Sequence, residues 1–198
     1  MQTTPEVGDE FVAISCVNVG VGPGGTTSML ARVALVDYKG HVLLDHYVQP
    51  TPGVTLTDCR TASTGITYED LYSDNSLSFS EVQMKVGKMV KGKILVGYCI
   101  WNDLSVLGMS HPAVHTRDVG LYQPFRNALR SPNTIIRLPT LAWTLLNRRC
   151  SEGLLNPVEM ARAAIDIYRS AAEDWENAIT NRNWPSALPP STFSRCYY

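Results

Sequence analysis

One aspartate stands out as a residue that could do chemistry. Asp103 follows Tyr98, Cys99 and Trp101 within a few positions. Burial in apolar surroundings disfavours the charged form of a carboxyl group and raises its pKa. An aspartate with a raised pKa can act as a general acid or base near neutral pH. Asp103 is therefore the candidate catalytic residue, and Tyr98 and Trp101 are the candidate lining of its cleft.

A nucleophile is not indicated near this residue. Ser15 and Cys16 are adjacent, but a hydroxyl or thiol nucleophile needs a base beside it, and all four histidines fall elsewhere: His41, His46, His111 and His115. Cys16 also faces the opposite side of its expected strand from Ser15, toward the core. The five scattered cysteines form no CxxC pair, which indicates reduced thiols in an intracellular protein.

Hydrophobic patterns predict the elements that position these residues. Runs rich in Val, Ile and Leu predict strands at 10–21, 29–38, 41–49 and 94–98, with turns at 22–25 and 39–40. Helices are predicted from about 80 to 92, from about 102 to 109 and over 138–146, the last burying Leu138, Leu141, Trp143 and Leu145. Strands first, then helix, strand and helices, predict an α/β domain with a mixed β-sheet flanked by helices.

The last helix has the clearest start. Asn156 suits the N-cap, Pro157 the first helical position and Glu159 the acid of a capping box. Apolar residues then recur three and four positions apart, which predicts one continuous helix with a single buried face: Val158, Ala161, Ile165, Tyr168, Ala172, Trp175 and Ile179. An irregular, proline-containing tail follows.

Length and composition set the frame. With 198 residues, 44% hydrophobic and 18% charged, the chain predicts one globular domain over residues 1–181, with a core at about 11–178, and a tail at 182–198. The net charge of -1 gives no general attraction to nucleic acid or to an anionic membrane, so no membrane partner is expected. The polar, acidic start resembles no leader peptide, so an intracellular location, cytoplasmic or nuclear, is expected.

Several stretches occur in one order and at consistent spacings from about residue 11 to 178: 20–23, 28–33, 47–50, 57–66, 92–97, 102–104, 117–118 and 161–168. Together they resemble the DEDDh family of 3′–5′ exonucleases, in its RNA exonuclease 4 and interferon-stimulated exonuclease branch. This resemblance implies a ribonuclease H-like exonuclease fold.

The resemblance also implies a site chemistry. Family members use four acidic residues and one histidine; the carboxylates hold two divalent metals and the histidine is the general base. The matching positions of the first strand are Ser15 and Val17, and those of the last helix are Leu155 and Met160, so only Asp103 remains. Sliding the last helix by one residue would bring Glu159 to the acidic position but would rotate the apolar face by about 100°. No metal and no cofactor is therefore expected.

Three hypotheses follow. The expected function is a catalytically degenerate, exonuclease-like binding module for a protein or RNA, in which arginines contact RNA: Arg126, Arg130, Arg137, Arg148 and Arg149. The alternative is an enzyme or binder for an apolar small molecule, of cyclase, isomerase or hydrolase type, that uses the old nucleotide cleft with Asp103 as acid or base. In a third hypothesis Asp103, Asp118 and Glu159 form a rearranged nuclease site, although Asp118 suits a structural contact better. Against the alternative, Val17, Leu155 and Met160 could simply fill the cleft.

Overall fold

A mixed β-sheet carries the fold in the computed structural model, which describes residues 8–198. Most of the polar start, on which the expectation of no leader rests, lies outside the described residues. Across them the strands are β1 (Phe11–Val21), β2 (Thr27–Asp37), β3 (Val42–Tyr47), β4 (Leu56–Asp58), β5 (Ile94–Gly97) and β6 (Thr116–Asp118). The helices are α1 (Thr61–Thr64), α2 (Tyr68–Leu71), α3 (Phe79–Val90), α4 (Ile100–Leu107), α5 (Gln123–Ala128), α6 (Leu138–Leu146), α7 (Pro157–Arg169) and α8 (Ala172–Thr180).

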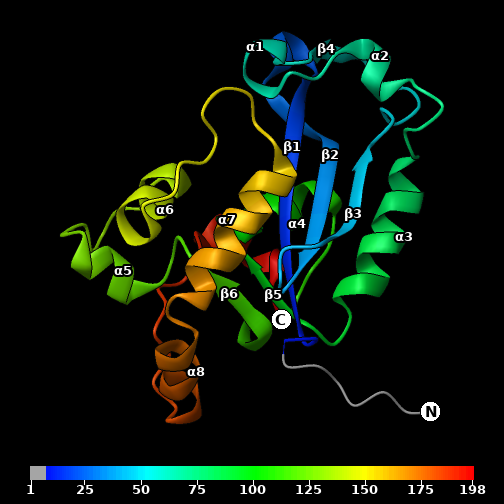
Figure 1. Cartoon of the computed structure of the whole chain (residues 1–198). Coiled ribbons are helices and arrows are strands. Elements are labelled where there is room, and N and C mark those ends of the chain that lie inside the picture. Colours follow the sequence, from blue (N-terminus) through cyan, green and yellow to red (C-terminus); the bar gives the residue numbers. More distant parts are fainter. Residues whose placement is uncertain (1–7) are drawn as a thin grey trace.

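The strand order is β3-β2-β1-β5-β6, and β4 pairs with the far end of β1 (Figure 1). β1, β2 and β3 form an antiparallel meander, whereas β5 joins β1, and β6 joins β5, in parallel. Parallel neighbours need a crossover, and α3 supplies it between the meander and β5. The predicted α/β class with a mixed sheet is confirmed.

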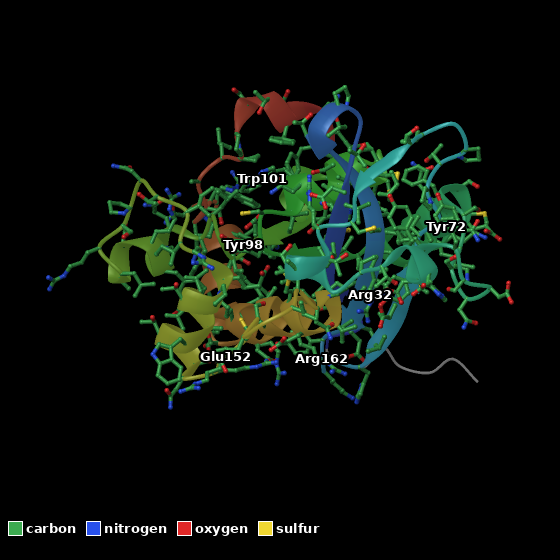
Figure 2. The ribbon with its side chains drawn as sticks, turned by 90° about the horizontal axis from the view of Figure 1, so that it is seen from above. Arg32, Tyr72, Tyr98, Trp101, Glu152 and Arg162 are labelled. Atoms are coloured by element: carbon green, nitrogen blue, oxygen red, sulfur yellow. The ribbon has the colours of Figure 1, made fainter. Side chains whose placement is uncertain are left out.

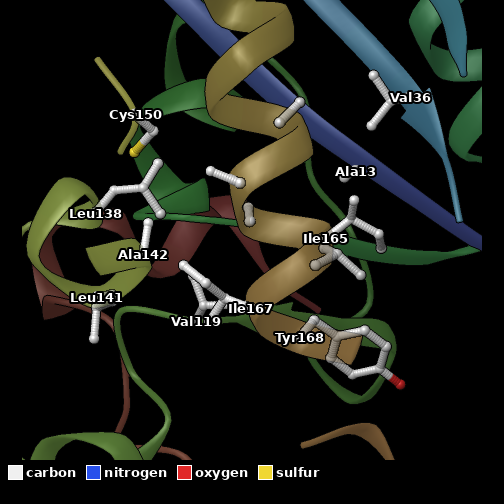
Figure 3. Packing of buried hydrophobic residues seen from close by; sticks show 14 of the residues in the cluster. Ala13, Val36, Val119, Leu138, Leu141, Ala142, Cys150, Ile165, Ile167 and Tyr168 are labelled. Carbon is white, nitrogen blue, oxygen red and sulfur yellow. The ribbon is translucent and has the colours of Figure 1, made fainter. Parts of the chain in front are cut away.

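Alternation along the first residues of β1 sends their side chains to two separate cores. Ala13 faces α7, together with Ala34 and Val36 of β2, whereas Val12 and Ile14 face α3 and α4. Figure 3 shows α7 between the sheet residues Ala13 and Val36 and the α6 residues Leu138 and Ala142. Helices therefore cover both faces of the sheet, and both faces of β1 are apolar in consequence.

The predicted long last helix is two helices. The Ser170 hydroxyl donates to the Ile167 carbonyl oxygen at 2.7 Å, and Ala171 leaves the helical region at φ -133° and ψ 15°. After this break α8 places Trp175 on Tyr122, with ring centroids 3.9 Å apart. The prediction of one helix was wrong because both helices turn their apolar faces to the same core, so the periodicity continues across the break.

Three smaller expectations also differ. Trp143 is 51% exposed, although its α6 neighbours Leu138 and Leu141 are buried as predicted. Asn156 caps α7 by accepting from the N–H groups of Val158 and Glu159 at 3.0 and 3.4 Å, but the side chain of Glu159 does not complete a capping box. Helix α4 begins at Ile100, two residues earlier than expected, because the carboxylate of Asp118 accepts a hydrogen bond from the Ile100 N–H.

No helix within residues 8–198 is long and apolar enough to cross a membrane.

Candidate functional site

Asp103 lies against the middle of β1. Asp103 belongs to the first turn of α4 and is 7% exposed to solvent. Its Oδ1 accepts a hydrogen bond from the backbone N–H of Cys16 at 3.1 Å. Ser15 and Val17 flank that N–H on the same strand. The structure therefore brings Asp103 to the backbone of β1 between Ser15 and Val17, across 87 positions of the chain.

Burial controls the protonation of this carboxyl group. Removal from water raises the pKa of Asp103 well above its ordinary value, and the nearby charge of Asp118 raises it further, while the Cys16 N–H opposes the shift. The pKa of the Cys16 thiol is also raised, first by burial and then by Asp103. Asp103 can therefore retain a proton at a pH where an exposed aspartate has lost it, and the thiol beside it stays protonated.

Asp118 has a different environment, because backbone N–H groups surround it. Its Oδ1 accepts from Cys99 at 3.1 Å and from Gly120 at 2.9 Å, and its Oδ2 accepts from Ile100 at 2.8 Å. Cys99 takes up a left-handed conformation at φ 54°, which turns the chain into α4. Burial raises the pKa of Asp118 to about 6, and the backbone hydrogen bonds oppose the shift. Asp118 therefore caps the helix that carries Asp103.

The other two expected cleft residues lie on the α7 side. Met160 is partly buried and packs against the core beneath α7, whereas Leu155 precedes the helix, is 36% exposed and donates its N–H to the Ser63 carbonyl oxygen at 2.8 Å. Val17 packs in another cluster, with Ile66 and Leu71. Four cavities of 420–580 Å³ within residues 8–198 are lined by residues other than these three.

The two aromatic residues before Asp103, both labelled in Figure 2, have different neighbours. Trp101 is 4% exposed and packs against Phe193 of the C-terminal segment, with ring centroids 6.5 Å apart. Tyr98 lies over Gly120, where a β-carbon would meet its ring at 3.0 Å, so this ring covers the Asp118 cap. Neither contact joins the aromatic ring to Asp103.

Most of the arginines considered for RNA contact have partners in the fold. Arg126 is 6% exposed and donates to the Thr134 carbonyl oxygen at 3.1 Å. Arg148 pairs with Asp166, and Arg149 pairs with Glu152 at 3.4 Å. Arg137 precedes α6 as its N-cap residue, and Arg130 follows α5.

The side chains present do not fit a two-metal centre. Among residues 8–198, no group of three or more His, Cys, Asp or Glu side chains is placed to hold a metal ion. Hard divalent cations take about six oxygen ligands each, and the two carboxylates at the start of α4 accept hydrogen bonds from backbone N–H groups instead. Of the three acids in the rearranged-site hypothesis, Glu159 does not join this pair in a metal-holding group.

Known proteins resemble this chain over most of its length. No family model matches. RNA exonuclease 4 of Mus musculus is 37% identical over 90% of the chain, that of Candida glabrata 39% over 84%, and that of Homo sapiens 38% over 86%. The chain spans 40%, 62% and 39% of these relatives, respectively.

Solved structures agree with the fold. The Pan2 catalytic unit of Neurospora crassa superposes with a TM-score of 0.72 at 22% identity, covering 92% of this chain and 29% of that one. The Pan2 module of Saccharomyces cerevisiae in complex with AAGGAA RNA gives 0.73 at 24% identity, covering 88% and 30%. The expected ribonuclease H-like exonuclease fold is thus confirmed.

The expected function needs correction. The prediction of a degenerate, non-nuclease binding module, with a repurposed small-molecule site as alternative, is contradicted by the curated relatives, which carry the name of an exonuclease. No comparison indicates degeneracy or a binding-module role. The prediction was wrong because it used five positions as the measure of activity, whereas the similarity extends over 84–90% of the chain.

Proposed function

Because this chain is a relative of RNA exonuclease 4, in the DEDD family of exonucleases, we propose that it shortens RNA from the 3′ end. The observation that carries the proposal is the 37–39% identity over most of the chain to curated proteins of that name. Since the chain spans 39–62% of those relatives, their activity is transferred to it only as this proposal.

The support comes from similarity rather than from a metal site. The described residues do not fit the two metals of the family. Asp103 is the chain's own contribution: a buried carboxyl group, fixed by the Cys16 N–H, whose raised pKa suits proton transfer.

An RNA degradation assay tests the proposal. Single-stranded RNA with a 5′ label is incubated with the purified chain in Mg²⁺, in Mn²⁺ and in excess chelator. We expect a ladder of products that shorten from the 3′ end, and no ladder with an RNA whose 3′ end is blocked. Absence of shortening under all three conditions, at enzyme in excess over RNA, would refute the proposal.

A matched pair of variants assigns the activity to this chain. Asp103→Asn removes the acid while keeping its shape, and we expect about a 100-fold or greater loss of rate. Asp74→Asn makes the same change at an exposed position and should keep the wild-type rate. Equal rates in both variants would show that the shortening does not use Asp103, whatever its source.

A further inference from the structure

The C-terminal segment closes a cavity against the edge of the sheet. β6 is the last strand in the order of the sheet, and the chain returns past it at residues 184–198. Backbone hydrogen bonds fix this segment at both ends. At its start, Gln123 N–H donates to the Pro185 carbonyl oxygen and Ala187 N–H to that of Leu121, both at 2.9 Å. At its end, His111 N–H donates to the Cys196 carbonyl oxygen and Ala113 N–H to that of Tyr198, both at 3.0 Å. Between these two pairs of hydrogen bonds lies a cavity of about 580 Å³.

The walls of this cavity are mainly apolar. Val114 and Ala113 form one side, Leu121 lies toward the core, and the returning segment supplies Trp184, Ala187 and Leu188. Pro189 and Pro190 follow in the wall, and proline fixes its own backbone angle φ, which restricts how far this wall can collapse inward. The volume lies within the range of sites for small organic molecules, about 300–1,000 Å³.

One polar group in the wall has no partner. Ser186 lines the cavity, and its Oγ is buried without a hydrogen-bond partner in the part of the chain that the structure describes. A buried hydroxyl group left without a partner costs about 1–3 kcal/mol. Because water does not reach this oxygen, a ligand in the cavity does not reach it either, so the hydroxyl is a cost of the wall itself and no part of the binding surface.

Asp118 restricts the charge of the ligand. It lines the same cavity, and its backbone partners hold it in place. Above about pH 6 its carboxylate is charged and repels anions, including nucleotide phosphates. The cavity is thus unsuited to the RNA backbone and differs in position and chemistry from the β1 face where Asp103 lies.

We propose that this cavity, between β6 and residues 184–197, binds an uncharged and largely apolar small molecule. The inference does not depend on exonuclease activity, because no residue of the Asp103 contact with β1 lines the cavity. A ligand here would touch Asp118 and thereby the start of α4.

Titration with N-phenyl-1-naphthylamine tests this inference. The probe is neutral and apolar, has one N–H donor, and gains fluorescence in apolar sites. At pH 7.5 we expect saturable binding at one site. Ala187→Phe fills the cavity from the C-terminal segment and should weaken binding about tenfold or more, whereas Ala62→Phe, the same change at an exposed position of α1, should leave it unaltered.

A further variant keeps the test decisive. Val114→Trp fills the cavity from the opposite wall. It serves as the test variant if the Ala187→Phe protein is not folded, which loss of its near-ultraviolet circular dichroism would reveal. No saturable binding to the wild type, or wild-type affinity in both filled variants, would overturn the proposal, and it would do so independently of any result with RNA.

Discussion

Asp103 and Asp118 illustrate how two buried aspartates close to one helix take different tasks. Asp103 accepts one backbone N–H, from β1, whereas Asp118 accepts three, from the start of α4 and from Gly120. The sequence indicated Asp103 as a buried acid. For Asp118 a structural contact was expected, but not the cap, because Asp118 reaches Ile100 across 18 positions from a strand of three residues. A short strand leaves too few residues for a hydrophobic alternation to be recognised.

Asp118 should make the stability of the fold depend on pH. Its pKa is about 6 in the fold and about 3.9 in an unfolded chain, so between these values the folded protein binds more protons. The free energy of unfolding should therefore fall as the pH rises from 4 to 6, and then level off. Two pKa units correspond to roughly 3 kcal/mol.

The variant Asp118→Asn isolates this effect. Burial gives Asp103 a shift of the same sign, while hydrogen bonds lower the pKa of Asp37, Glu81 and Glu176, so the wild type alone would mix several contributions. Urea unfolding of both proteins at pH 4, 5, 6 and 7 yields the difference in free energy of unfolding. We expect this difference, wild type minus variant, to decrease from pH 4 to 6; a constant difference would contradict the assignment.

At the scale of elements, α7 shows which helix features a sequence reveals. Its cap at Asn156 and its proline at the first turn were predicted and confirmed. The capping boxes lie instead at Thr67 with Asp70 and at Ser78 with Glu81, where a hydroxyl residue precedes an acid by three positions. That spacing was available in the sequence. The break before α8 had no such signal, since Ser170 and Ala171 are both compatible with a helix interior.

The cap of α7 should contribute measurably to stability. Asn156→Ala removes the acceptor for the N–H groups of Val158 and Glu159, and we expect a loss of about 1 kcal/mol in the free energy of unfolding. Asn156→Asp keeps an acceptor oxygen there and should stay within about 0.5 kcal/mol of the wild type. Urea unfolding at pH 7 measures both, and equal losses in the two variants would contradict a role for the side-chain oxygen.

At the scale of the whole molecule, an ion pair joins the sheet edge to α8. Arg117 of β6 is 3% exposed and donates Nε and Nη2 to the two carboxylate oxygens of Glu176 at 2.7 and 2.8 Å. Tyr168 of α7 donates its hydroxyl to the same carboxylate at 2.8 Å. A strand thus meets two helices that lie about 50 residues further along the chain at one side chain, and no local pattern could have predicted the contact of Arg117 with Glu176 across 59 positions.

Loss of this carboxylate should loosen α8. Glu176→Gln leaves the buried guanidinium of Arg117 with one acceptor fewer. We expect the free energy of unfolding to fall by about 1–2 kcal/mol, and by no more than this because the Glu176 side chain is 35% exposed to solvent. Glu173→Gln changes an exposed glutamate of the same helix and serves as control, with a change below about 0.5 kcal/mol. Thermal unfolding followed by tryptophan fluorescence reports the difference, because Trp175 lies in α8. Equal midpoints for the two variants would show that the pair does not hold α8.

The sheet and its site were predictable to different degrees. Long runs such as 10–21 became strands with nearly the predicted bounds, since a strand buried on both faces is apolar throughout. The short elements β4, β6, α1, α2 and α5 were missed, because three to six residues carry no periodicity. The position of Asp103 beside the first strand was implied by the family resemblance. The cavity under residues 184–197 arises from a tail that was expected to be irregular and that forms a short 3-10 helix at Ser191–Cys196.

The packing of α7 on β1 and β2 has a consequence for the synthesis of the protein. Strands β1 to β3 leave the ribosome first, but the helix that covers one face of them ends at Arg169, more than a hundred residues later. At about 5–20 residues per second, the meander exists for on the order of 10 s with the apolar side chains of Ala13, Ala34 and Val36 uncovered. During that interval the nascent chain presents the surface that folding chaperones recognise, and a stop before residue 157 would leave the sheet permanently in that state.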